Sequence, residues 1–201
     1  MLAAFAVWTA AVRLVDIQPI GPRESAVGFA SLNRFVHNFT GVHLTLYSIT
    51  DWLGLVPIGF VMGFAVLGLV QWIQRKEIRK VDQSILVLGC FYLVVMAVFV
   101  FFEEFIVNYR PVLIEGILEA SYPSSTTMLV MCVMPTAAMQ LNSRIGNCVF
   151  RRYILWTINA FTAFMVTGRL LSGVHWLTDI IGGILLSLGL VMMYSSVSGL
   201  E

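Results

Sequence analysis

The sequence between residues 168 and 179 reads GRLLSGVHWLTD and separates two long apolar runs. If a helix begins near His175, Asp179 lies on the same face one turn later, where its carboxylate can orient the imidazole. Arg169 precedes His175 by six residues across a Ser-Gly break and can offer a planar guanidinium to a phosphate. Because ionisable groups at the edge of hydrocarbon are costly, we interpret the three as functional candidates; the alternative is an ion pair that joins two helix ends.

The composition indicates a helical protein that crosses a membrane several times. Of the 201 residues, 59% are hydrophobic and 11% are charged, which is more apolar surface than a soluble core of this size can bury. A net charge of +1 argues against nucleic acid as a partner. The 3 cysteines show no metal-ligand spacing, so we interpret them as free thiols.

The apolar runs predict an all-α fold, a polytopic six-helix transmembrane bundle that forms one domain over residues 1–201. The stretch Leu32–Phe39 has the apolar spacing of a short helix at the membrane surface. Seven of the 12 basic residues fall in two loops, 75–82 and 142–152, which the positive-inside rule places in the cytoplasm with both chain ends. The first apolar run could also be a signal peptide, but we favour a membrane span. The expected spans are residues 1–15, 52–73, 84–102, 128–141, 153–171 and 176–194.

This topology brings distant polar segments to the outer side of the membrane. Arg110 and Arg169 could neutralise an oxyanion from two directions. The segment Pro123-Ser124-Ser125-Thr126 precedes an expected span, so its backbone N–H groups and the Ser124 hydroxyl could bind a phosphate at a helix start. The alternative for this segment taken alone is an ordinary helix N-cap. Together these residues predict a phosphate site with an outward-facing opening.

The same residues resemble the motifs of the type 2 phosphatidic acid phosphatase family, membrane relatives of the vanadium haloperoxidases. The matching positions are Arg110-Pro111, then Pro123-Ser124, then Arg169 with His175 and Asp179, within a core at residues 84–197. The resemblance implies that His175 forms a phosphohistidine and that Asp179 orients it. It also implies that the phosphoryl oxygens are held without a metal or other cofactor, by Arg110, Ser124, Ser125, Thr126 and Arg169.

Two positions depart from the family pattern. Glu103 stands where the family has a lysine, and Thr126 stands where it has a histidine that protonates the leaving oxygen. Loss of a general acid costs about 10²–10⁴ in rate. A lipid phosphate with a last pKa of about 6 leaves without that proton, so we expect a bias towards lipid diphosphates such as isoprenoid diphosphates. Alternatively His37 or His43, which otherwise resemble surface histidines, supplies the proton.

The sequence therefore favours a membrane lipid phosphatase with a phosphorylated lipid as substrate, in contact with membrane lipids. Two alternatives are a non-catalytic relative that binds phosphorylated lipid or a protein, and a transporter of phosphorylated lipids. His175 together with Asp179 favours the enzyme, because a binding protein needs the arginines but not this pair. Short loops and few cysteines suggest a bacterial plasma membrane.

Overall fold

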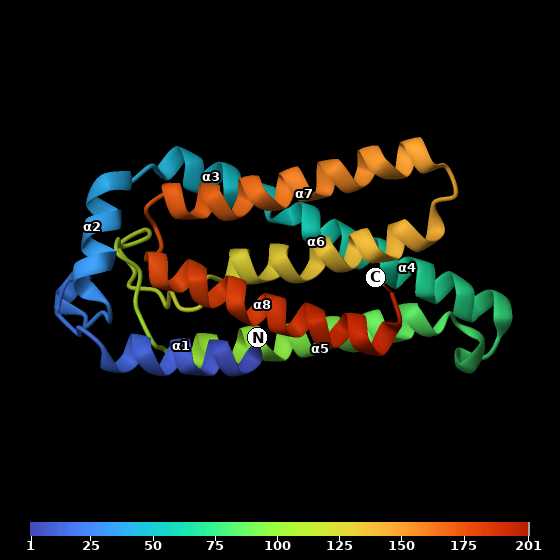
Figure 1. The fold of residues 1–201 in the computed structure, drawn as a ribbon, viewed down its shortest axis with the longest axis horizontal. Helices are drawn as coiled ribbons and strands as arrows, with labels where there is room; N and C mark the ends of the chain where they lie inside the picture. The colour runs from blue at the N-terminus through green and yellow to red at the C-terminus, as the bar shows by residue number, and fades with distance from the viewer. Residues whose placement is uncertain (201) are drawn as a thin grey trace.

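Long helices run side by side along one axis in the computed structural model, which describes residues 1–200 (Figure 1). The chain is all-helical in outline, as expected from its apolar runs. In chain order the helices are α1 (Leu2–Leu14), α2 (Ala30–Thr40), α3 (Leu44–Leu53), α4 (Leu55–Arg75), α5 (Gln83–Glu104), α6 (Ser125–Arg144), α7 (Cys148–Leu171) and α8 (Leu177–Ser198), with 3-10 turns at Pro22–Glu24 and Ile78–Lys80.

Four helical stretches among the described residues are long and apolar enough to cross a membrane: Leu44–Arg75, which joins α3 to α4, and helices α5, α7 and α8. These four match four of the expected spans. At 13 residues, α1 is about 20 Å long, which is less than the roughly 30 Å of a bilayer core. Helix α6 has 20 residues but a less apolar composition.

The composition of α6 follows from its place in the centre of the bundle. It packs against α4, α5, α7 and α8, so much of its surface contacts protein rather than lipid. Gln140 is buried on this helix and donates to the Tyr194 hydroxyl at 2.7 Å and to the Ser84 carbonyl at 3.0 Å. A buried helix can carry such polar groups when each has a partner, which explains its lower hydropathy.

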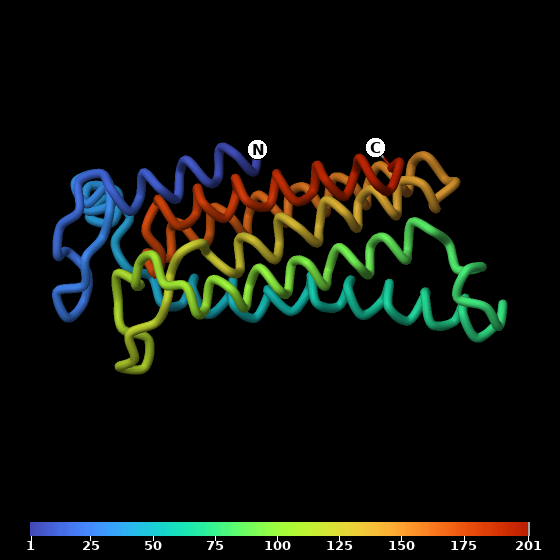
Figure 2. Tube along the Cα trace, turned by 90° about the horizontal axis from the view of Figure 1, so that it is seen from below, coloured from blue at the N-terminus to red at the C-terminus, as the bar shows by residue number. Residues whose placement is uncertain are grey.

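The two ends of the bundle differ in charge and structure (Figure 2). At one end the α4–α5 and α6–α7 turns carry most of the basic residues, and Asp82 joins three helices there. Its carboxylate pairs with Arg75 at 3.0 Å and Arg144 at 3.1 Å and accepts a hydrogen bond from Gln71 at 2.8 Å. At the other end lie α2, the segment 105–124 and the α7–α8 connection, which contain the candidate residues.

A close backbone contact fixes the α7–α8 connection. Gly173 has a φ of +68°, and a Cβ at this position would lie 1.9 Å from the Gly41 carbonyl oxygen. The backbone N–H of His43 donates to the Ser172 carbonyl at 2.9 Å. The connection therefore packs against the α2–α3 turn so tightly that only glycine fits.

We expect Gly173→Ala to lower the unfolding temperature in detergent. A positive φ costs an alanine roughly 1–2 kcal/mol, and its Cβ would also clash with the Gly41 carbonyl oxygen. Each kcal/mol corresponds to about 2–4 °C in a chain of this size. Gly116→Ala is the matched control, since Gly116 has a φ of +79° with no atom within 4 Å of the added Cβ. Equal shifts for the two variants in thermal unfolding would contradict the close contact.

Candidate active site

The α7–α8 connection places His175 and Asp179 in a buried position. Helix α8 begins at Leu177, two residues after His175, and Asp179 lies in its first turn. The Asp179 carboxylate accepts from the backbone N–H of Trp176 at 3.0 Å, which closes the helix start. A helix therefore begins close to His175, as expected, although His175 itself lies just before the helix.

A serine hydroxyl lies between the two side chains. Ser121 Oγ is 3.0 Å from His175 Nδ1 and donates to Asp179 Oδ2 at 2.6 Å. Asn108 Nδ2 donates to the other carboxylate oxygen at 3.1 Å. Asp179 therefore contacts His175 through Ser121 and not by a direct hydrogen bond.

Arg169 extends from the last turns of α7 into the protein. Its Nη1 donates to the Thr50 hydroxyl at 3.3 Å, and its Nη2 lies 3.5 Å from Asp51, which is exposed. The guanidinium carbon lies 4.8 Å from the centre of the Tyr47 ring. One weak ion pair with an exposed carboxylate leaves much of this buried charge uncompensated.

Arg110 approaches the same aromatic ring from the segment between α5 and α6. Its guanidinium carbon lies 5.8 Å from the centre of the Tyr47 ring, and its Nε lies 3.0 Å from the Glu119 carboxylate. The structure therefore brings together the two arginines, which are 59 positions apart in the chain, on one side chain of α3.

The start of α6 adds backbone and hydroxyl donors. Ser124 is the N-cap residue, and its own N–H donates to the Asp179 carbonyl at 3.1 Å, which ties α6 to the first turn of α8. The backbone N–H groups of Ser125, Thr126 and Thr127 lie in the first turn, where a helix leaves its donors free. With the helix dipole, these groups are suited to bind an anion.

Several buried polar atoms at this end have no hydrogen-bond partner among the described residues. They come from four segments of the chain, and most are donors that an anion would satisfy. This set comprises Arg110 Nη1, Arg169 Nε, Ser124 Oγ, Thr127 Oγ1 and His175 Nε2. Outside it, Ser25 Oγ and His37 Nδ1 also lack a partner in the described part of the chain. Such a set is costly without a ligand and is suited to the oxygens of a phosphoryl group.

The surroundings keep the imidazole of His175 neutral. Burial is the main cause that lowers the pKa of His175 well below its ordinary value, and the positive charges of Arg110 and Arg169 lower it further. A neutral imidazole has a lone pair on one ring nitrogen. At neutral pH His175 can therefore act as a nucleophile.

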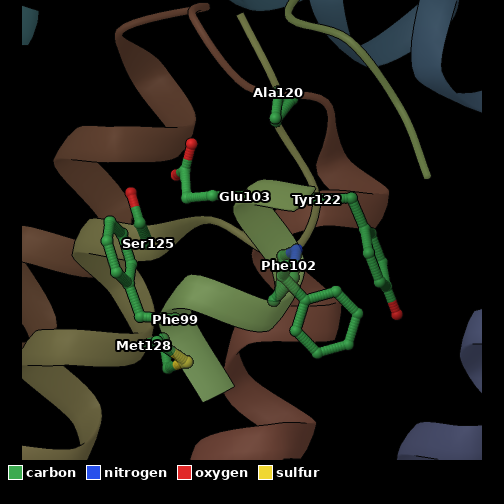
Figure 3. A pocket seen from close by; sticks show the side chains of 9 residues that line it. Phe99, Phe102, Glu103, Ala120, Tyr122, Ser125 and Met128 are labelled. Carbon is green, nitrogen blue, oxygen red and sulfur yellow. The ribbon is translucent and has the colours of Figure 1, made fainter. Parts of the chain in front are cut away.

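Glu103 is an exposed residue in the last turn of α5, at the end of the bundle that contains His175. Its side chain lines a small pocket with Ser121 and Ser125, and Figure 3 shows the Glu103 carboxylate and the Ser125 hydroxyl pointing to the same side. No described residue forms a salt bridge with Glu103. The structure thus places an anion beside the start of α6.

The two other histidines lie on α2 and directly before α3. His37 is half-buried with its ring centre 5.4 Å from that of Trp176, and burial lowers its pKa. His43 is exposed, and its Nε2 lies 2.9 Å from the Thr40 carbonyl. No described contact joins either ring to the phosphate-site residues, so a proton-donor role for them stays a prediction.

An apolar cavity begins at the first turn of α6. It has a volume of about 330 Å³ and lies between α4, α5 and α6. Ser125 and Thr126 line it together with the apolar side chains of Ile58, Val61, Val95, Met96, Phe99, Met128, Leu129 and Val133. A hydrocarbon chain in this cavity would have its polar end at the anion-binding start of α6.

Several residues in this arrangement were not singled out in the sequence. Ser121 and Asn108 contact Asp179, and Tyr47 contacts both arginines. Ser121 and Asn108 each lie within three residues of a quoted motif, which is a weak signal in a polar segment. Tyr47 has no such signal, because only the packing of α3 against α7 brings it to Arg169.

The sequence model of the PAP2 superfamily matches residues 90–199, which is more than half of the chain. This match decides the family. The chain belongs to the PAP2 superfamily. The matched range includes Arg110, Ser124, Arg169, His175 and Asp179.

A solved structure agrees with this assignment at the level of the fold. It is the crystal structure of the first transmembrane PAP2 type phosphatidylglycerolphosphate phosphatase from Bacillus subtilis, with a TM-score of 0.65 and 18% sequence identity. The alignment covers 97% of this chain and 92% of that chain. A comparison with curated proteins finds no match. This PAP2 chain therefore shares the transmembrane PAP2 fold over nearly its whole length.

We expect inorganic phosphate to bind the purified PAP2 protein and raise its unfolding temperature, because the phosphate satisfies the unpaired donors. Arg169→Gln should weaken phosphate binding by about 10- to 100-fold, the value of a hydrogen bond to a charged group. Isothermal titration measures the affinity. Arg79→Gln, in the 3-10 turn Ile78–Lys80, is the matched control and should bind normally. Unchanged affinity in Arg169→Gln would contradict the proposed anion site.

Proposed function

We propose that this protein is a membrane lipid phosphatase that releases phosphate from a lipid phosphate or diphosphate through a phosphohistidine. The observation that carries the proposal is the unpaired, buried Nε2 of His175 beside unpaired guanidinium and hydroxyl donors. A neutral imidazole together with a cationic anion site is the arrangement that nucleophilic phosphoryl transfer needs.

In the first step the lone pair of Nε2 forms a bond to phosphorus, and the bond from phosphorus to the leaving oxygen breaks. The leaving oxygen takes the bonding electrons. Arg110, Arg169 and the α6 amides stabilise the charge on the remaining phosphoryl oxygens. In the second step water attacks phosphorus, and the electron pair of the phosphorus–nitrogen bond returns to Nε2. Phosphate is released, and the imidazole is again neutral.

The cavity between α4, α5 and α6 supports a lipid as the substrate. Its lining is apolar except for Tyr92 and for Ser125 and Thr126, where the helix start can hold the phosphate. We infer that the hydrocarbon chain occupies this cavity with the headgroup at the start of α6. This placement explains why a phosphate site would be buried at the end of a bundle of apolar helices: the hydrocarbon chain needs apolar surroundings and the headgroup needs the polar helix start.

The leaving group determines which lipid phosphate reacts best. Thr126 faces the apolar cavity and cannot protonate a leaving oxygen near neutral pH. An alkoxide needs that proton, whereas a lipid phosphate does not, because its last pKa is about 6. We therefore propose a preference for lipid diphosphates, including isoprenoid diphosphates.

We propose six membrane spans, with α1 and α6 added to the four apolar stretches. Helix α6 is covered by neighbouring helices, so its polar groups need not contact lipid. The basic residues gather at the end opposite His175, and the positive-inside rule then places His175 at the outer side of a bacterial plasma membrane. The substrate would lie in the outer leaflet.

Glu103 and Thr126 favour one alternative, a relative that binds phosphorylated lipid and hydrolyses it slowly or not at all. Glu103 adds a negative charge beside the anion site, and Thr126 offers no general acid. Such a protein would use the arginines in the same way but would form no phosphohistidine. The experiment below separates it from the enzyme.

We expect the purified protein to release phosphate from one or more members of a panel of lipid mono- and diphosphates. Brief incubation with radiolabelled substrate should give a phosphoenzyme that is labile in acid, as phosphoramidates are. His175→Ala should abolish both signals, because it removes the nucleophile. Arg79→Gln, in the 3-10 turn Ile78–Lys80 at the opposite end of the bundle, should retain both. Substrate binding without a phosphoenzyme would favour the binding relative.

We expect a lipid diphosphate to react faster than the monophosphate with the same hydrocarbon chain. A missing general acid costs about 10²–10⁴ in rate, so kcat/KM for the diphosphate should exceed kcat/KM for the monophosphate by about 10²-fold or more. Thr126→His should raise the monophosphate rate more than the diphosphate rate. Equal rates in the unchanged protein, or a faster monophosphate, would contradict the preference.

A further inference from the structure

The hydroxyl of Ser121 holds a position that the reaction scheme above leaves unexplained. Ser121 is buried, and its Oγ contacts both His175 Nδ1 at 3.0 Å and Asp179 Oδ2 at 2.6 Å. No described hydrogen bond joins Asp179 directly to His175. The hydroxyl is therefore the connection between the carboxylate and the imidazole.

The partners of Asp179 fix the direction of these hydrogen bonds. Its carboxylate contacts two further groups that can only donate here, Asn108 Nδ2 at 3.1 Å and the Trp176 N–H at 3.0 Å. An ionised carboxylate only accepts, so the single hydroxyl proton of Ser121 points to Asp179. Ser121 Oγ then accepts from His175, which places the imidazole proton on Nδ1. Nε2 is left with its lone pair and no partner.

We infer that Ser121 is a positioning residue that fixes His175 in the Nδ1–H tautomer and transmits the negative charge of Asp179 to it. This inference deepens the proposed function and rests on it for the role of Nε2. When Nε2 bonds to phosphorus, the ring keeps its Nδ1 proton and becomes positively charged. The oxygen of Ser121, polarised by Asp179, stabilises that charge.

The charged groups around His175 make this connection important. Arg110 and Arg169 both oppose a positive imidazole, from the segment before α6 and from the end of α7. Asp179, on the first turn of α8, is the buried carboxylate that favours it, and it acts through Ser121. Without the hydroxyl, Nδ1 loses its link to Asp179, and a hydrogen bond with the Ser121 backbone is the interaction that still raises the pKa of His175. The pKa of His175 would then fall further.

The tautomer can be measured without any substrate. Nitrogen-15 NMR of histidine-labelled protein, with the His175 signals identified by their loss in His175→Gln, should show Nδ1 protonated and Nε2 unprotonated at neutral pH. Ser121→Ala should shift His175 towards the Nε2–H tautomer. A predominantly Nε2–H imidazole in the unchanged protein would overturn the inference, whether or not the protein hydrolyses lipids.

A kinetic experiment uses the lipid that the protein hydrolyses fastest in the panel of mono- and diphosphates described above. Ser121→Ala should lower kcat by about 10- to 100-fold, typical of a residue that orients an imidazole, and should move the acidic limb of the pH profile to lower pH. Ser121→Thr, which keeps a hydroxyl, should restore most of the rate. Ser187→Ala is the matched control, because Ser187 is also buried but donates to the Met128 carbonyl at 3.3 Å within the bundle.

The outcomes separate this inference from the proposed function. An Nδ1–H imidazole in a protein that hydrolyses no lipid phosphate supports the placement of Ser121 and contradicts the phosphatase. An active Ser121→Ala with an unchanged rate overturns the role of Ser121 alone. A lower rate with an unmoved acidic limb and no recovery in Ser121→Thr shows that Ser121 only supports the fold, and it also overturns the role.

Discussion

Two buried guanidinium groups lie against one aromatic ring. The other residues at this end of the bundle have to accommodate these two positive charges. Arg169 is 1% exposed and Arg110 is 8% exposed, and both contact Tyr47. Burying one cation without a strong partner is costly, and burying two that repel one another is more so. Their carboxylate partners, Asp51 and Glu119, are each partly in solvent and compensate little of this cost. An anion with several oxygens would stabilise both groups at once.

The remainder of the bundle provides the rigidity that holds this arrangement. Helix α6 is packed on four sides, and its first turn is joined to α8 through Ser124 and Asp179. Asn33 on α2 also reaches α8, where it donates to the Thr178 hydroxyl at 3.0 Å. At the opposite end the Asp82 cluster joins α4, α5 and α6. The candidate residues thus lie at helix ends and in the adjoining connections, and contacts between helices fix them.

Much of the fold could be predicted because apolar runs of about 20 residues have few alternatives to a membrane helix. The expected starts of α5 and α8 lie within one residue of those observed. The expected start of α7 was five residues late, because Asn147 caps the helix by accepting from Val149 and Phe150 in a polar segment with no apolar signal. The expected second span began at residue 52, so α3, which begins at Leu44, was not predicted, because Thr45, Thr50 and Asp51 interrupt the apolar pattern there.

The candidate site was predictable where residues are close in the chain and unpredictable where packing brings them together. The spacing of His175 and Asp179 predicted a helix start beside His175, whereas the hydroxyl between the two side chains comes from Ser121, 54 positions earlier. The contact of Tyr47 with Arg110 and Arg169 likewise depends on how α3 lies on α7. The family motifs include Asp179, which the resemblance gives an orienting role. They do not include Ser121, Asn108 or Tyr47, which contact the motif residues.

The apolar cavity between α4, α5 and α6 determines how a lipid would reach the protein. A lipid that occupies this cavity need not leave the bilayer, so it reaches the protein by diffusion in two dimensions. The quantity that governs the encounter is then its mole fraction among the surrounding lipids, not its concentration in bulk water. Added detergent would dilute the substrate within the micelle surface even when the total amount in the tube is constant.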